Sequence, residues 1–324
     1  MEKIKISKTD LEVSRIILGC MQLGKTWNAE PISDDTIKNA INVIKTALDE
    51  GINFFDHADI YARGKSEEVF SHIWKEISGL RNKIILQSKC GIRFPNDPED
   101  GSPGRYDFSY EHITKSVEGI LRRLKTDFLD ILLLHRPDPL VEPEEVAKAF
   151  DELHAAGKVR YFGLSNHTAP QIEYLKKFIA QPIIVNQLEL SILHSDLIEE
   201  GVTFNQKHPS RGIRNIGTIE YCRLNDITIQ SWAPLAKGKL FAENLTDEKL
   251  KIARDVVIAS AEKYNVSKEA IMIAWVLRHP AKIQPVIGTT KAERVKACCQ
   301  ANKVQLSRED WYKLYIAGRG EALP

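Results

Sequence analysis

The sequence lacks several features that define large classes of protein. No apolar run approaches the ~20 residues that a membrane helix needs. The opening stretch alternates charged residues with isoleucine instead of forming the apolar core of a signal peptide. The 45 basic and 44 acidic side chains nearly cancel, which argues against nucleic acid or anionic lipid as a partner. The five cysteines are odd in number and lack metal-site spacing, so a cytoplasmic protein with no metal is expected.

The chain also lacks a G-x-G-x-x-G stretch after any predicted strand, which weakens the case for an open, doubly wound sheet. Short apolar runs instead alternate with helical patterns along the whole length. The eight expected strands are 16–19, 52–56, 83–89, 128–134, 159–164, 183–187, 227–231 and 283–287. A small hairpin at 3–13 precedes them, and a further helix near 307–317 follows. The pattern predicts one α/β domain over residues 1–324, a (β/α)₈ TIM barrel with an N-terminal β-hairpin and a C-terminal extra helix.

The expected helices begin at residues that commonly cap helices. The first starts at Ser33 and closes at Gly51, the second starts at Ser66, and the third starts near Ser109. The fourth runs from Pro143 to a point before Gly157. Later helices are expected around Ile172, Leu175 and Phe178, near 213–224, over 247–279 with a break at Asn265, and from Lys291. Two long connectors, 91–107 and 191–212, exceed the usual length and are typical of functional lids or of disordered segments.

Three apolar strands end in a reactive group. The runs end at Asp56, at Lys89 and just before His135, and Tyr61 follows the first of them closely. If the strands are neighbours in a parallel barrel, the four side chains meet at one end of it. Each residue alone has an ordinary explanation, such as a turn cap for Asp56 or a half-buried aromatic for Tyr61. Chance is a much weaker explanation for three separate strands that all end in a reactive group.

The four groups suit the activation of a carbonyl. A tyrosine with its usual pKa of about 10 is a poor acid near neutral pH, and a nearby lysine is expected to lower that pKa. Asp56 would keep Lys89 charged, while a neutral His135 would orient a carbonyl oxygen. No residue is placed to attack the carbon, so a hydride carrier is the natural nucleophile.

These residues resemble the aldo-keto reductases, NADPH-dependent carbonyl reductases with a (β/α)₈ fold. The segment Asp56-His57-Ala58-Asp59-Ile60-Tyr61 is similar to the family's Asp-Thr-Ala-x-x-Tyr, with His57 in place of threonine. The resemblance implies that Tyr61 is the general acid, that Lys89 and Asp56 tune its pKa, and that His135 orients the carbonyl.

The resemblance extends to the cofactor. Gly163-Leu164-Ser165-Asn166 and Gln187 look like the residues that bind the nicotinamide carboxamide, and Trp232 matches the residue that stacks on its ring. The segment 288–294 looks like the adenosine 2′-phosphate site, although glycine stands at 288 where many members carry lysine. The implied NADP-binding set is Gly19, Met21, Gln22, Asp56, Ser165, Asn166, Gln187, Trp232, Ala233, Pro234, Leu235, Lys237, Gly238, Leu240, Gly288, Thr290 and Arg294.

The preferred hypothesis is NADPH-dependent reduction of a small-molecule aldehyde or ketone by a monomer or weak homo-oligomer. Trp27, Arg93 and Arg136 are candidate substrate residues. Two alternatives stay open at this point. One is a Schiff-base aldolase that uses Lys89 as its amine, and the other is a cofactor-loaded regulatory or sensor subunit with little turnover.

Overall fold

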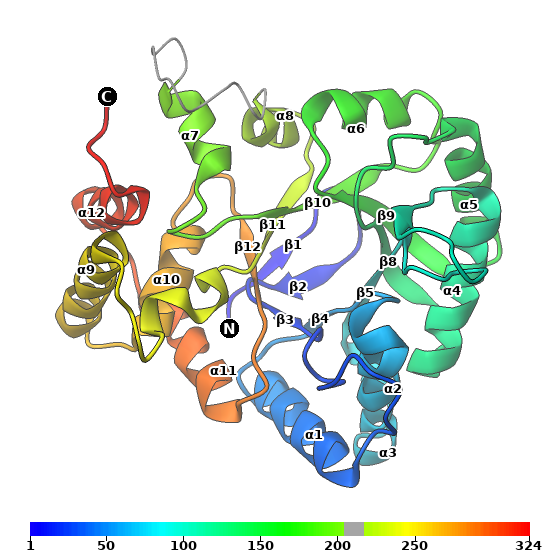
Figure 1. The fold of residues 1–324 in the computed structure, drawn as a ribbon, viewed down its shortest axis with the longest axis horizontal. Coiled ribbons are helices and arrows are strands. Elements are labelled where there is room, and N and C mark those ends of the chain that lie inside the picture. Colours follow the sequence, from blue (N-terminus) through cyan, green and yellow to red (C-terminus); the bar gives the residue numbers. More distant parts are fainter. Residues whose placement is uncertain (204–216) are drawn as a thin grey trace.

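Eight parallel strands close into a barrel in the computed structural model, which describes residues 1–203 and 217–324 (Figure 1). Around the barrel the order is β10-β11-β12-β3-β4-β5-β8-β9, and β9 pairs with β10 to complete the circle. The strands are β3 (Ile17–Gly19), β4 (Phe54–Asp56), β5 (Ile85–Cys90), β8 (Leu129–Leu134), β9 (Val159–Ser165), β10 (Ile183–Glu189), β11 (Thr228–Trp232) and β12 (Gln284–Ile287). The barrel prediction is confirmed, and closure excludes the open sheet.

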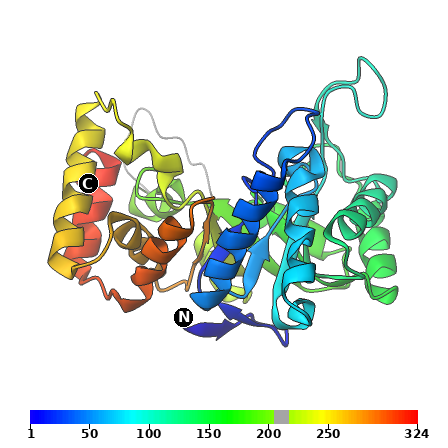
Figure 2. The same ribbon diagram turned by 90° about the horizontal axis from the view of Figure 1, so that it is seen from below.

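An N-terminal hairpin seals one end of the barrel. Strand β1 (Lys3–Lys5) pairs antiparallel with β2 (Glu12–Ser14), as predicted. Apolar side chains from the hairpin region and from the barrel interior form one buried cluster: Ile6, Leu11, Val13, Ile17, Phe54, Ile131, Leu133, Ile184, Val185 and Val286. Figure 2 shows the hairpin at one end of the barrel and a long loop projecting from the other. A polar site at the strand ends can therefore open only at the opposite end of the barrel.

Helices surround the barrel and bury one face against it. They are α1 (Asp34–Asp49), α2 (Lys65–Ser71), α3 (Ile73–Glu76), α4 (Tyr110–Leu124), α5 (Pro143–Ala155), α6 (Ala169–Lys176), α7 (Asp196–Thr203), α8 (Thr218–Leu224), α9 (Glu248–Tyr264), α10 (Lys268–Leu277), α11 (Ala292–Cys299) and α12 (Arg308–Arg319). Short 3₁₀ turns are η1 (Tyr61–Gly64), η2 (Leu80–Lys83), η3 (Ala236–Phe241) and η4 (Gln300–Lys303). Ser33 and Ser109 cap α1 and α4 as expected, and Asn265 separates α9 from α10.

The second predicted helix differs from the structure in two ways. It divides into α2 and α3, and the Ser71 hydroxyl donates to the Glu68 carbonyl beside the break, competing with the helical ladder. It also starts one residue early, at Lys65, because the Ser66 hydroxyl is used elsewhere. That hydroxyl donates to the Met21 carbonyl at 2.9 Å and accepts from Gly24 N–H at 3.2 Å, which fixes the loop after β3.

The long connectors contain regular structure that the sequence pattern did not indicate. Strands β6 (Ile92–Arg93) and β7 (Arg105–Tyr106) form an antiparallel hairpin within 91–107. Helix α7 lies within the predicted insertion 191–212. Residues 204–212 of that insertion fall outside the described residues, and so do residues 213–216 of the helix predicted over 213–224. Phe178, expected within the same helix as Ile172 and Leu175, lies beyond the end of α6 and is 39% exposed.

Candidate active site

Three strand ends and one 3₁₀ turn bring the four predicted groups together. Asp56 ends β4, Lys89 lies near the end of β5, His135 follows β8, and Tyr61 opens η1. The Lys89 ammonium lies 2.7 and 2.8 Å from the two Asp56 carboxylate oxygens and 3.1 Å from the Tyr61 hydroxyl. The rings of Tyr61 and His135 meet edge to face, with centroids 5.9 Å apart.

Lys89 is the centre of this group. Its side chain is fully buried, and its remaining contact is to the His57 carbonyl at 2.8 Å. Burial alone would lower the pKa of Lys89, but Asp56 and Tyr61 together outweigh burial and raise that pKa. The ammonium is therefore charged at neutral pH and donates to the tyrosine oxygen. Since that oxygen already accepts a hydrogen bond, the Tyr61 O–H is directed to a different acceptor.

The expected lowering of the Tyr61 pKa is not what the structure gives. Burial raises the pKa of Tyr61, and the opposing effect of the Lys89 ammonium is smaller. The phenol is consequently protonated at neutral pH, as a proton donor must be. Lys89 is thus better described as limiting the rise that burial causes and as stabilising the phenolate that remains after proton transfer.

His135 is neutral at physiological pH. Burial, Lys89 and Arg136 all lower its pKa, to well below the usual value. Its Nδ1 has no hydrogen-bond partner among the described residues, and its carbonyl accepts from the Asn166 side chain at 3.2 Å. A neutral imidazole whose ring lies beside that of Tyr61 can donate an N–H to a carbonyl oxygen.

A glutamine layer lies beneath Asp56, and of its three members only Gln187 was predicted from the sequence to have a role, in nicotinamide binding. Gln87 and Gln187 donate to Asp56 Oδ1 at 2.6 and 3.1 Å, and both also donate to the side-chain oxygen of Gln230. All three are buried inside the barrel. The sequence signal was a glutamine in each of three predicted strands, 83–89, 183–187 and 227–231. The layer satisfies the Asp56 oxygen that Lys89 shares, and so fixes the carboxylate.

The residues matched to nicotinamide binding lie at adjoining strand ends. Ser165 ends β9, and its hydroxyl donates to the Gln187 carbonyl at 2.9 Å. Asn166 adopts a positive φ of 62°, donates to Ser165 Oγ, and accepts at 3.1 Å from the Trp232 indole N–H. Trp232 is half-buried, so part of its ring is accessible at the barrel mouth.

The loop after β11 has an unusual backbone. Ala233, Ala236 and Lys237 have φ values of 51°, 50° and 56°, and Gly238 has 77°. Left-handed conformations are costly for residues other than glycine and tend to cluster at functional sites. Pro234 and Leu240 are buried and anchor the loop, while Leu235 is half-buried and Lys237 is exposed beside Glu189 at 3.2 Å.

A cavity of about 430 Å³ lies between the loop after β3, helix α1 and the start of α11. Four members of the implied NADP-binding set, Gln22, Gly288, Thr290 and Arg294, line it, together with Leu23, Lys25, Asp35, Thr36, Asn39, Thr289 and Lys291. Three cations, Lys25, Lys291 and Arg294, line the cavity with one carboxylate, Asp35, and Arg294 also lies 3.7 Å from Glu269, so positive charge is in excess, which suits an anion. Gly19 ends β3 and Met21 precedes Gln22 in the loop that follows, and a Cβ at Gly19 would meet Val286 at 2.9 Å.

Comparison with known proteins decides the family. The Aldo/keto reductase family model matches residues 15–317. The chain belongs to the aldo/keto reductase family. It is 36% identical to the uncharacterized oxidoreductase YcsN of Bacillus subtilis, with all of both chains covered. It is 34% identical to a 6-dehydroglucose reductase of Agrobacterium fabrum, with 99% of each covered. The glycerol dehydrogenase AKR11B4 of Gluconobacter oxydans shares the fold, with a TM-score of 0.81, 24% identity and coverage of 99% and 97%.

As a member of the aldo-keto reductases, the protein is an oxidoreductase that acts on carbonyl compounds. The resemblance seen in the sequence is thereby confirmed. No helix in the described part of the chain is long and apolar enough to cross a membrane. Residues 1–203 and 217–324 also contain no cluster of three metal-ligating side chains.

The three candidate substrate residues of this aldo-keto reductase have different surroundings. Trp27 is 41% exposed, and its carbonyl accepts from the Arg63 guanidinium at 3.0 Å. Arg93 is held within the β6–β7 hairpin region by Asp97, Asp107 and the His112 ring. Arg136 is half-buried, with its guanidinium 5.5 Å from the centroid of Trp232.

A buried ionisable cluster behind the tyrosine was missed by the sequence analysis. Glu67 accepts from Ser88 at 2.8 Å and pairs with Arg123 at 2.7 Å. Burial, followed by the nearby Glu67 charge, raises the pKa of Asp59 to about 7. His57, in place of the family's threonine, packs edge-on against Phe70, and burial followed by Lys89 lowers its pKa to about 3. The Arg123 charge thus lowers the pKa of both carboxyl groups, Glu67 and Asp59, against the rise that burial causes.

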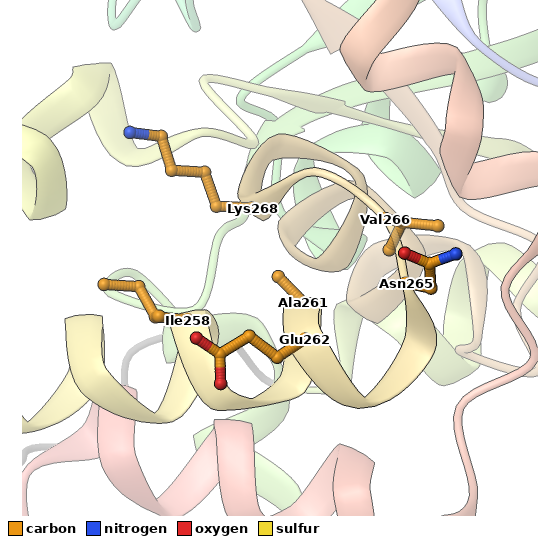
Figure 3. Close-up of a pocket in the computed structure, with 6 residues that line it drawn as sticks. All are labelled: Ile258, Ala261, Glu262, Asn265, Val266 and Lys268. Atoms are coloured by element: carbon orange, nitrogen blue, oxygen red, sulfur yellow. The ribbon is translucent and has the colours of Figure 1, made fainter.

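A second cavity, of about 350 Å³, lies among the outer helices at the junction of α9 and α10 (Figure 3). One acid, Glu262, and one base, Lys268, are the charged residues that line it. The Lys268 ammonium lies 4.0 Å from the Phe241 ring centroid. This cavity is lined by α9, the first residue of α10 and the link between them, and it holds none of the strand-end groups, so we place the candidate site at the barrel mouth.

Proposed function

We propose that this aldo-keto reductase reduces an aldehyde or ketone to an alcohol with NADPH, and that Tyr61 is the general acid. The single observation that carries the proposal is the Lys89 ammonium, which bridges the Asp56 carboxylate and the Tyr61 hydroxyl inside the barrel. Residues 1–324 would act as one domain, as a monomer or weak homo-oligomer. The five cysteines are buried and free, in keeping with a cytoplasmic protein.

The residues present fit a dinucleotide. Ser165, Asn166 and Gln187 would hold the carboxamide, with Trp232 against the ring. Because the Gln187 nitrogen is committed to Asp56 and Gln230, its Oε1 would accept from the amide. The strained loop Ala233–Leu240 would cover the pyrophosphate, and the three cations of the larger cavity would hold the 2′-phosphate near Gly288, Thr290 and Arg294. Lys25 and Lys291 supply charge where glycine replaces the lysine of many members.

A reduced nicotinamide, when bound, supplies the hydride that adds to the carbonyl carbon. The chain's own residues manage the oxygen. His135, kept neutral, and the Tyr61 O–H converge on the carbonyl oxygen, and Tyr61 gives it a proton. Lys89, kept charged by Asp56, stabilises the phenolate until Tyr61 regains a proton from solvent. The same raised pKa of Lys89 disfavours the Schiff-base alternative, which needs a neutral amine.

The test is Tyr61→Phe. Cofactor oxidation with a panel of aldehydes is expected to be abolished in this variant, while NADPH binding, followed by fluorescence, is retained. Tyr174→Phe, on the outer helix α6 and 47% exposed, is the matched control and is expected to behave as wild type. Wild-type rates in Tyr61→Phe would refute the assignment. NADPH binding by the wild type without turnover of any aldehyde would favour the regulatory alternative instead.

A further inference from the structure

Arg136 is a cation without a counter-ion at the mouth of the barrel. It is half-buried, and no aspartate or glutamate of the described chain forms a salt bridge with it. Residues 204–216 contain neither of these acids. Arg93, by contrast, has Asp97 and Asp107 within 3.6 Å and 3.3 Å. A partly buried guanidinium without a carboxylate is costly unless an anion from outside meets it.

A continuous set of contacts connects Arg136 with Tyr61. Arg136 follows His135, whose ring lies 5.9 Å from that of Tyr61. The His135 carbonyl accepts from Asn166, and Asn166 accepts from the indole of Trp232. The Arg136 guanidinium lies 5.5 Å from the centroid of this indole, within the range of a cation–π contact. Arg136 is therefore on the wall beside the reacting groups.

The other cations near these groups already have partners. Lys237 also lies over Trp232, at 5.2 Å, but it pairs with Glu189 at 3.2 Å. Lys89 is paired with Asp56. Arg63 is exposed, stacks on Phe94 at 4.6 Å and donates to the Trp27 carbonyl. Arg136 is thus the partly buried positive charge at the mouth that is left for a ligand.

We infer that the substrate is a carbonyl compound that also carries an anionic oxygen group, such as a carboxylate, and that Arg136 binds this group. The inference rests on the proposed reductase function and adds a substrate class to it. A guanidinium offers paired N–H donors that match the two oxygens of a carboxylate. Anchoring that end would direct the carbonyl toward Tyr61 and His135.

Two aldehydes of nearly equal shape test the inference, para-carboxybenzaldehyde and its neutral amide, para-carbamoylbenzaldehyde. With NADPH, wild type is expected to favour the carboxylate in kcat/KM by roughly 10- to 100-fold, the range of a charge-assisted hydrogen bond. Arg136→Met is expected to bring the ratio close to unity, and Arg136→Lys to leave an intermediate ratio. Arg122→Met, on the exposed face of α4, is the control and should keep the wild-type ratio.

The outcomes separate the two proposals. Reduction of both aldehydes with equal kcat/KM would overturn the anionic substrate and leave the reductase function standing. Reduction of neither would refute the reductase function, and the inference would fall with it. A preference removed by Arg63→Met and kept in Arg136→Met would overturn the assignment to Arg136. So would an equal loss of NADPH affinity in Arg136→Met, because the guanidinium would then serve the cofactor.

Discussion

Replacing Asp56 with asparagine is the sharpest test of the buried charge pair. The side chains of Lys89 and Asp56 are 0% and 3% exposed, so neither charge has water as a substitute partner. Asparagine keeps one oxygen for the donors but turns its amide N–H groups toward Lys89 or the glutamines. Removing one member of a buried pair typically costs about 3–5 kcal/mol, and we expect Asp56→Asn to lower the free energy of unfolding by that amount.

Urea unfolding followed by circular dichroism measures this difference, with Glu76→Gln as the control. Glu76 pairs with Lys45 at 2.7 Å, but both side chains are about two-fifths exposed, at 40% and 42%. Loss of that surface pair is expected to cost less than about 1 kcal/mol. The double variant Asp56→Asn, Lys89→Met removes the stranded charge and is expected to recover part of the loss. If Asp56→Asn destabilises no more than Glu76→Gln, our account of the pair is wrong.

Three further perturbations follow from the site. His57 has a pKa of about 3, so below pH ~6.5 the unfolded chain binds a proton that the folded chain does not. The free energy of unfolding therefore decreases as the pH is lowered, by about 2 kcal/mol at pH ~5 for this residue. His57→Thr should flatten that part of the stability profile in pH-dependent melts. Asp59, with a raised pKa of about 7, has the opposite sign: its contribution is lost as pH rises from ~4 to ~7. Asp59→Asn should thus gain more stability over wild type in urea titrations at pH ~8 than at pH ~5, and equal gains would contradict this. Arg294→Ala should weaken NADPH binding roughly tenfold while sparing NADH, measured by fluorescence titration; equal losses would place no phosphate at Arg294.

The barrel was predictable because each strand is a short apolar run between capped amphipathic helices. Four strand-end groups were predictable for the same reason, since the parallel register places Asp56 and Lys89 at one end. The direction of the Tyr61 pKa shift was not, because it depends on how completely the fold removes water from the phenol. The Asp59–Glu67–Arg123 cluster was likewise hidden, since its members come from three separate elements. The role of Ser66 shows the same limit: its hydroxyl fixes a neighbouring loop instead of capping its own helix.

The glutamine layer divides the molecule into a part that tolerates change and a part that does not. Gln87, Gln187 and Gln230 satisfy one another and Asp56 in a closed hydrogen-bonding circuit, so even an apparently mild exchange such as Gln230→Glu would add a second buried anion beside Asp56. Loops beyond the strand ends that hold none of the proposed catalytic or cofactor-binding residues, such as 91–107, carry no such constraint. New substrate preferences are therefore expected to arise, in nature or by engineering, through exchange of those loops over an unchanged interior.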